Sequence, residues 1–185
     1  SIILVANHSS YIDIMMMFRM RKRPFVFVGK KEIEKIPIFG YLYKRSAITV
    51  DRSSFKSRSK VYERAKEVIR DGYSICVFPE RDYLDETILL NQFKIGAFKM
   101  AVEHKLPILP IVFYDCKRKF PWYATHGHCG SLRVRALKVI ETSKLGYDSI
   151  KALSMKVHQE IERSLLQDPS KQALKAIEIW KKKVF

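Results

Sequence analysis

The sequence predicts an α/β fold: a single domain over residues 1–185, with a mixed, mostly parallel sheet flanked by helices. Short apolar and β-branched runs alternate along the chain with longer segments of helical periodicity, and this alternation is typical of such sheets. A chain of 185 residues is also long enough to bury roughly 70% of its unfolded surface in one domain. No internal repeat, linker or low-complexity tract divides it.

The expected strands are short runs of apolar and β-branched side chains. In chain order they are Ile2 to Ala6, Phe25 to Val28, Ala47 to Val50, Ser74 to Phe78, Ile108 to Tyr114 and Leu132 to Val139. The longest clean apolar run, Leu106 to Val112, has the length of a strand and falls short of the ~20 residues that span a bilayer. We therefore expect no transmembrane helix in this sequence.

Helical periodicity accounts for much of the sequence between these strands. One apolar helical face includes Val61 and Ala65, and we expect this helix to stop near Asp71-Gly72 because glycine favours a helix exit. Another helix is expected after Gly96. A third ends before Asp168-Pro169 and has an apolar side chain at every fourth position: Leu153, Val157, Ile161 and Leu165.

Two predicted helices have apolar faces that could pack in the core or contact another partner. The helix expected after His8 carries soft side chains that suit either a core or a site for a flexible apolar ligand: Met15, Met16, Met17, Phe18 and Met20. Residues 170–185 form a basic amphipathic pattern with apolar side chains such as Ile177 and Trp180. This C-terminal helix suits docking on the domain, which we prefer, or contact with an anionic membrane.

Polar residues follow three of the predicted strands at the point where each strand ends. Asn7-His8 follows the first strand, Asp51-Arg52 the third and Pro79-Glu80-Arg81 the fourth. In open α/β sheets ligands bind at the carboxyl ends of the strands. We therefore expect the three clusters to converge on one crevice.

His8 and Asp13 are the candidates for catalysis. Histidine titrates near neutral pH, and a carboxylate one helical turn away can fix its tautomer and stabilise the imidazolium. If Ser10 caps the following helix, Asp13 lies at its third position, where a negative charge also suits the helix end. Asp13 thus fits both a catalytic role and a capping role.

Charge and cysteine content limit the partners and the compartment. A net charge of +16 and a pI near 9.8 indicate an anionic partner, and nucleic acid, anionic lipid and an acidic carrier protein all qualify. The three cysteines, Cys76, Cys116 and Cys129, form no CxxC pair, which favours a reducing, cytosolic compartment without disulfides. We expect no metal, because the run from His126 to Cys129 lacks a second ligand cluster. Cys116 could be a nucleophile, but no histidine lies near it in the sequence to activate it.

Four blocks in the sequence resemble the glycerolipid acyltransferase family, whose best-known members are the 1-acylglycerol-3-phosphate acyltransferases. Residues 7–13, NHSSYID, resemble its NHxxxxD block, and residues 47–52, AITVDR, resemble its second block. Residues 77–80, VFPE, resemble the start of FPEGTR, and residues 93–98, FKIGAF, resemble the FKxGAF segment that follows it. Residues 106–111, LPILPI, resemble the fourth block, an apolar strand with proline.

The resemblance implies a family fold and direct transfer of an acyl group from a thioester to an alcohol. His8 would be the general base, and Asp13 would orient its ring. The amides near Ser9 and Ser10 would stabilise the oxyanion. The acceptor site would include Arg52, which suits a phosphate, with Glu80, Arg81 and Lys30.

The sequence departs from the family where Arg81-Asp82-Tyr83 replaces Gly-Thr-Arg. We expect transfer from acyl-CoA or acyl carrier protein to a lysolipid, with 1-acylglycerol-3-phosphate as the leading acceptor and no cofactor. The altered block leaves an amino-acid-containing lysolipid as an alternative.

Two other function classes remain as alternatives. A basic nucleic-acid-binding module is favoured only by charge and by scattered aromatics such as Tyr41, Tyr43 and Trp122, so we expect no nucleic acid. An inactive lipid-binding relative is the other. The sequence has no initiator Met and opens inside a predicted core strand, so we expect an upstream segment that could hold an anchor. The expected location is the cytoplasmic face of the cell membrane, peripheral or anchored by that segment.

Overall fold

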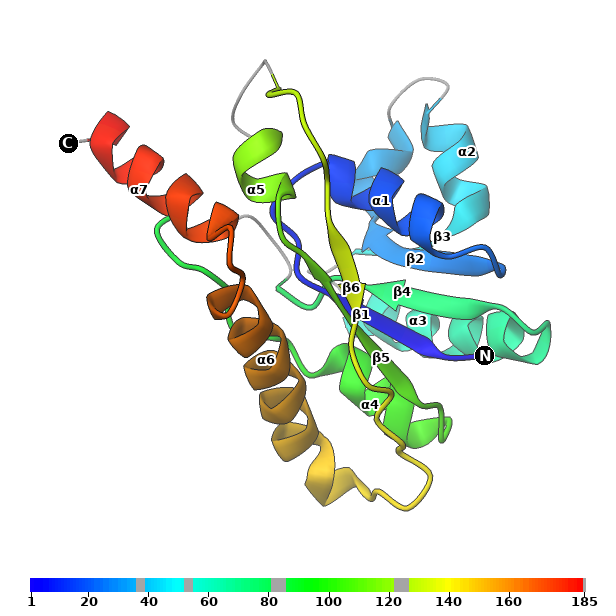
Figure 1. Cartoon of the computed structure of the whole chain (residues 1–185). Helices are drawn as coiled ribbons and strands as arrows, with labels where there is room; N and C mark the ends of the chain where they lie inside the picture. Colours follow the sequence, from blue (N-terminus) through cyan, green and yellow to red (C-terminus); the bar gives the residue numbers. More distant parts are fainter. Residues whose placement is uncertain (36–38, 52–54, 81–85, 122–126, 185) are drawn as a thin grey trace.

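A six-stranded sheet organises the described part of the chain, residues 1–35, 39–51, 55–80, 86–121 and 127–184 of a computed structural model (Figure 1). Its strands are β1 (Ile3–Ala6), β2 (Phe25–Lys30), β3 (Ala47–Val50), β4 (Ser74–Val77), β5 (Ile108–Phe113) and β6 (Val134–Ala136). The spatial order is β3-β2-β4-β1-β5-β6. All neighbouring pairs are parallel except β5 and β6, which run antiparallel. The predicted mixed, mostly parallel sheet is therefore confirmed.

Helices cover both faces of this sheet (Figure 1). On β1, Ile3 and Val5 point into one core, while Leu4 and Ala6 point into another, because successive side chains of a strand face opposite ways. The first core is closed by α3 (Phe55–Arg70), α4 (Gly96–Glu103) and α6 (Ile150–Leu166). The second is closed by α1 (Ile12–Met20) and α5 (Cys116–Lys119).

Glycine decides how α3 ends and how α2 (Phe39–Ser46) packs. Gly72 has a φ of 82°, a value that glycine adopts without strain. Its N–H donates to Ile69 O at 2.9 Å and that of Tyr73 donates to Val68 O at 3.0 Å, which is the predicted glycine exit. A Cβ on Gly29 would lie 1.5 Å from Tyr43 Oη, so the bare backbone of β2 makes room for α2.

Several short elements escaped prediction. They are α2, α5 and the 3-10 helices η1 (Lys31–Lys35) and η2 (Tyr147–Ser149). All but α2 are too short to show a helical period. The strand predicted from Leu132 to Val139 is paired only over the three residues of β6. It lies at the edge of the sheet, where one side has no partner strand to extend it.

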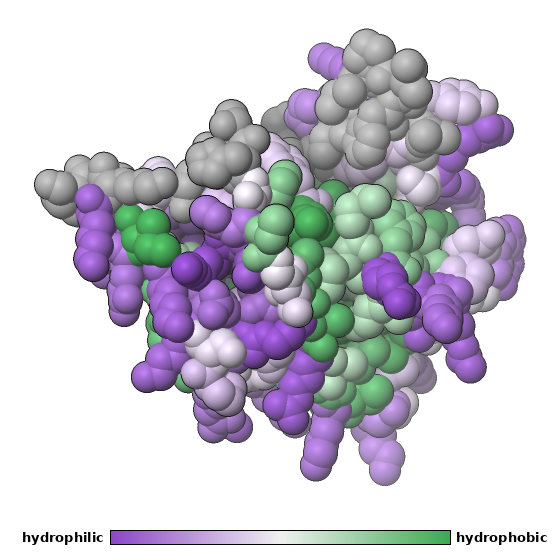
Figure 2. All heavy atoms as spheres, turned by 45° about the horizontal axis from the view of Figure 1, so that its top comes forward, coloured by the Kyte–Doolittle hydropathy of each residue, from purple (hydrophilic) through white to green (hydrophobic). Residues whose placement is uncertain are grey.

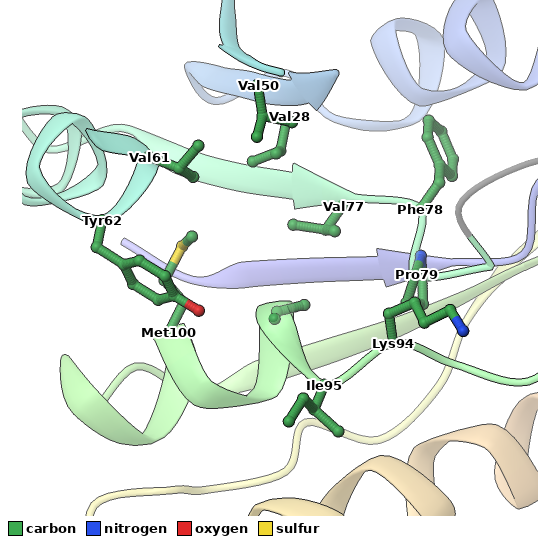
Figure 3. Close-up of a pocket in the computed structure, with 12 residues that line it drawn as sticks. Val28, Val50, Val61, Tyr62, Val77, Phe78, Pro79, Lys94, Ile95 and Met100 are labelled. Atoms are coloured by element: carbon green, nitrogen blue, oxygen red, sulfur yellow. The ribbon is translucent and has the colours of Figure 1, made fainter. Parts of the chain in front are cut away.

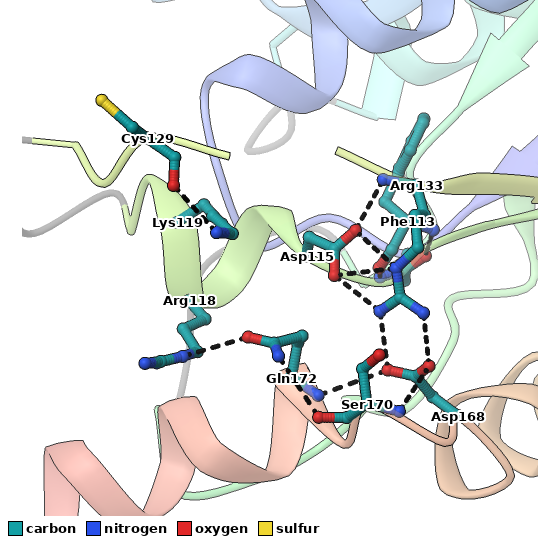
Figure 4. Close-up of polar contacts among 10 residues, drawn as sticks. Phe113, Asp115, Arg118, Lys119, Cys129, Arg133, Asp168, Ser170 and Gln172 are labelled. Carbon is teal, nitrogen blue, oxygen red and sulfur yellow. Dashed lines mark hydrogen bonds and ion pairs between the residues drawn. The ribbon is translucent and has the colours of Figure 1, made fainter. Parts of the chain in front are cut away.

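The C-terminal helix α7 (Gln172–Val184) is joined to the sheet through Arg133 (Figure 4). The guanidinium donates to Asp168 Oδ1 and to Asp115 Oδ1, both at 2.6 Å. Asp168 also accepts the N–H groups of Ser170 and Gln172, at the start of α7. Hydrogen bonds from Arg133 hold the pKa of Asp168 below its usual range. The buried side chains of α7 are Ala173, Ala176 and Ile177.

Among the residues described, no helix combines the length and the apolar character needed to cross a membrane.

Candidate active site

An imidazole and a buried carboxylate form a close pair where β1 ends. His8 Nδ1 lies 3.0 Å from Asp13 Oδ2, and the side chains are 17% and 0% exposed. The short loop from β1 to α1 sets this distance, since it returns Asp13 to the strand end within one turn. With Nδ1–H directed at the carboxylate, the basic lone pair of the neutral ring is on Nε2. The pair has the geometry of an oriented general base.

Asp13 is held in place by the loop that precedes it. Its Oδ2 accepts the N–H of Ser9 at 2.8 Å and the N–H of Ser10 at 2.9 Å. These are the two amides expected to bind an oxyanion, and that expectation is corrected here. Their hydrogens already point at Asp13, so they hold the carboxylate instead of facing a substrate.

Side-chain contacts also fix the loop between β1 and α1 to Phe113 of β5 and to Phe120 after α5. The Asn7 side chain accepts the N–H of Phe113 at 2.8 Å and donates to its carbonyl at 3.0 Å. The Ser10 hydroxyl donates to the carbonyl of Phe120 and accepts the N–H of Ile12. Helix α1 begins at Ile12, so Asp13 is its second residue instead of the third. Tyr11 is the N-cap residue and makes no side-chain capping hydrogen bond, so the expected cap by Ser10 is corrected, and Asp13 binds the loop amides that precede the helix.

Glu80 holds the backbone of His8 by a hydrogen bond. It is 4% exposed, and its Oε1 accepts the His8 N–H at 2.7 Å. Oε2 accepts the N–H of Asn91 at 2.8 Å and its side-chain amide at 3.2 Å. Burial raises the pKa of Glu80, and the hydrogen bonds from His8 and Asn91 partly offset the rise. Both oxygens of Glu80 thus accept hydrogen bonds from the protein, and its expected place in the acceptor site stays a prediction.

Two residues in contact with the catalytic pair had no positioning role in the sequence-based account. The Phe78 ring stacks on the His8 imidazole at 4.1 Å between centroids and 16° between planes. Cys116 is fully buried and its thiol lies beside Asp13. Burial first, then the carboxylates of Asp13 and Asp115, raise the pKa of Cys116 above its usual range. A thiol that stays protonated there is a poor nucleophile, which argues against an acyl-cysteine intermediate.

The remaining predicted site residues lie outside what the structure describes. Arg52 and Arg81 belong to the segments 52–54 and 81–85, and Lys30 is described only as the last backbone position of β2. Two strands separate β1 from β3, so Asp51 at the end of β3 is about 14 Å across the sheet from the end of β1, at about 4.8 Å per strand. Of the three polar clusters, the structure brings the first and third into contact through His8 and Glu80.

An apolar cavity of about 390 Å³ opens beside this site, on the face covered by α3 and α4 (Figure 3). Its walls include Val28 and Val77 from the sheet, Val61 from α3 and Met100 from α4. Lys94 stands at the rim, where its N–H donates to Pro79 O at 2.9 Å. A volume above about 300 Å³ is typical of cavities that hold a small apolar ligand.

The described residues contain no cluster of three or more metal-ligating side chains. His126, the first residue of the histidine-cysteine run, falls outside the described part. The expected absence of a metal therefore stays a prediction.

An α/β sheet that presents an imidazole–carboxylate pair beside an apolar cavity suits an enzyme that acts on an apolar substrate. The chain belongs to the acyltransferase family, because the model of that family matches residues 1–114. The match includes β1 to β5 and every residue of the site that precedes α5. The resemblance proposed from the motifs is thus confirmed.

Curated relatives and a solved structure agree with this assignment. The chain is 32% identical over 168 residues to the 1-acyl-sn-glycerol-3-phosphate acyltransferase of Saccharomyces cerevisiae, covering 88% of this chain and 55% of that protein. It is 29% identical to the Escherichia coli enzyme of the same name, covering 89% and 67%. A crystal structure of the lysophosphatidic acid acyltransferase PlsC from Thermotoga maritima shares the fold, with a TM-score of 0.74 at 20% identity over 90% of this chain and 66% of that one. The chain spans only part of each relative's length.

Proposed function

We propose that this protein transfers a fatty acyl group from an acyl thioester to the free hydroxyl of a lysolipid, with 1-acylglycerol-3-phosphate as the leading acceptor and phosphatidic acid as the product. The observation that carries the proposal is the 3.0 Å pair of His8 and the fully buried Asp13. The relatives named for this reaction supply the substrate class.

His8 acts as the general base in this proposal. Its Nε2 takes the proton of the acceptor hydroxyl while the oxygen attacks the thioester carbonyl carbon. The tetrahedral intermediate collapses, the carbon–sulfur bond breaks, and the departing thiolate recovers the proton from the imidazolium. Asp13 stabilises the imidazolium between these steps, and Phe78 and Glu80 keep the ring and its backbone in position.

The cavity beside the site is the proposed place for the acyl chain of the donor. A thioester that arrives through water binds more tightly when its acyl chain is enclosed, because each buried methylene contributes about 0.8 kcal/mol to the binding free energy. Val77 and Pro79 line the cavity on either side of Phe78, whose ring stacks on His8. A chain held there would place its carbonyl near the imidazole. Acyl-CoA and acyl carrier protein both remain donor candidates.

The acceptor headgroup is assigned to the basic residues around the strand ends. Lys94, at the rim of the cavity next to Pro79, adds a cation to the predicted set of Arg52, Arg81 and Lys30. A phosphate would be held by such charges. Because Arg81-Asp82-Tyr83 replaces the family's Gly-Thr-Arg, an amino-acid-containing lysolipid is the alternative acceptor.

An anionic membrane surface is the proposed place of action, at the cytoplasmic face. Helix α1 exposes Tyr11 beside its start and Met15 and Phe18 along its length, at 58%, 65% and 51%. Figure 2 shows an apolar area over α1 with hydrophilic side chains on either side. The exposed Lys22 and Arg23 follow the helix. Apolar side chains next to basic ones match an anionic bilayer, and we expect sedimentation with anionic vesicles to weaken with salt.

One transfer assay tests the proposal. Purified protein is given each donor in turn, with lysophosphatidic acid or an amino-acid-containing lysolipid as acceptor, and products are identified by mass spectrometry. We expect phosphatidic acid as the main product. A preference for the amino-acid-containing acceptor would move the proposal to that lipid. A salt-dependent shift of DNA without acyl transfer to any acceptor would refute it and favour the nucleic-acid alternative.

A further inference from the structure

An aromatic ladder runs from the catalytic imidazole to the protein surface. Phe78, stacked on His8, also stacks on Phe27, with centroids 5.9 Å apart and planes at 19°. Phe27 makes edge contacts with Phe25 at 5.1 Å and with Phe18 at 5.4 Å. Phe18 and Phe25 also touch each other, at 5.2 Å. The rings therefore form an unbroken apolar path.

Strand alternation puts Phe25 and Phe27 on the opposite face of the sheet from the cavity, whereas Phe78, at the inner end of the ladder, also lines the cavity. Phe25 and Phe27 are two residues apart on β2 and share its α1 face, whereas Val28 points to the cavity. At the end of β4, Val77 and Phe78 both line the cavity, and Phe78 also packs against the core on the α1 face (Figure 3). Two apolar regions, one on each face, thus meet beside His8.

Exposure increases along the ladder. Phe27 is 6% exposed and belongs to the core, but Phe18 is 51% exposed. Packing of the core alone does not require an aromatic ring at such an exposed position. The outer end lies on the apolar and basic surface of α1 that the proposed membrane contact uses.

We infer that the ladder of Phe18, Phe25, Phe27 and Phe78 binds the acyl chain already carried by the lysolipid acceptor. This inference rests on the proposed function, in which two hydrocarbon chains must reach one imidazole. The donor chain leaves water and needs an enclosed cavity. The acceptor chain leaves a bilayer, so an open apolar path that starts at the bilayer is sufficient. The sheet keeps the two chains apart, with Phe78 at their junction.

Photolabelling tests this placement directly. Lysophosphatidic acid with a diazirine at the end of its chain is bound to the intact protein without donor, irradiated, and the labelled peptides are sequenced. We expect labels within residues 14–27. Labels on Val61, Tyr62, Ile95, Ala97 or Met100, which line the cavity, would overturn the inference. The readout does not depend on turnover.

Kinetics of Phe18→Ser supply the second test, with Met155→Ser on α6 as a control of similar exposure, 54% against 51%. Assays use acceptors below their micelle concentrations and no vesicles, so membrane binding does not contribute. We expect the ratio of KM for a long-chain to a short-chain acceptor to rise about tenfold in Phe18→Ser, with the KM of the donor unchanged. An unchanged ratio would refute the ladder while wild-type transfer still supports the proposed function. No wild-type transfer to either acceptor would refute the proposed function itself.

Discussion

Replacing Asp13 with asparagine isolates the contribution of its negative charge. One oxygen, Oδ2, accepts all three hydrogen bonds, from His8 Nδ1 and from the amides of Ser9 and Ser10. The other oxygen, Oδ1, accepts no hydrogen bond from the described residues. An asparagine can therefore keep its oxygen at the Oδ2 position and its nitrogen at the Oδ1 position. The geometry is preserved while the negative charge is lost.

The expected loss of rate follows from the 3.0 Å separation of the pair. At an effective dielectric constant of about 20, an imidazolium and a carboxylate at this distance attract each other by about 5 kcal/mol. The His8 side chain is 17% exposed, so solvent weakens this attraction. We expect kcat to fall by about 10² to 10⁴, which corresponds to about 2.7 to 5.4 kcal/mol of transition-state stabilisation.

The assay compares initial rates of acyl transfer for wild type, Asp13→Asn, His8→Ala and the double variant. Asp148→Asn, an exposed carboxylate outside the site, is the control. Urea unfolding of each variant establishes that it is folded under assay conditions. Because the two residues act as one unit, the double variant should be no slower than His8→Ala. A rate for Asp13→Asn within twofold of wild type, or losses that simply multiply, would refute the reasoning.

Other residues give shorter predictions. Asp168→Asn should lower the free energy of unfolding by about 2 kcal/mol near neutral pH, because Arg133 and the start of α7 lose a charged acceptor. Since the pKa of Asp168 is lowered, the deficit should persist above about pH 4 and shrink as the pH falls further, and a constant deficit would contradict this. The pKa of Glu80 is raised, so the free energy of unfolding of wild type should fall relative to that of Glu80→Gln as the pH rises from about 4.3 through the raised pKa. Urea unfolding at several pH values measures this difference, and a difference that grows in favour of wild type as the pH rises would contradict the raised pKa. Val61→Phe should reduce kcat/KM for long donor chains about fourfold per excluded methylene, unlike the exposed Val139→Phe, and equal losses for all chain lengths would argue against the cavity.

The sequence was most informative where a pattern has a local physical cause. Alternating apolar runs predicted the sheet, and Gly72 predicted the end of α3, because both depend on neighbouring residues. The His8 and Asp13 pair could also be proposed, since they are five positions apart in the sequence and one loop joins them.

Contacts between segments that are distant in the sequence could not be predicted. Asn91 shares Glu80 with His8, yet no spacing rule connects residues that far apart. The stacking of Phe78 on His8 depends on β4 lying next to β1, which the order of motifs does not reveal. The amides of Ser9 and Ser10 were correctly placed at the start of α1, but their partner was misjudged because Asp13 turns back onto them.

The most direct test of the central claim is the rate at which purified protein converts labelled lysophosphatidic acid and an acyl thioester into phosphatidic acid, with and without His8. We predict steady product formation by wild type and a loss of at least about 10² in His8→Ala, the lower limit for a general base. Equal rates for the two proteins would contradict the account.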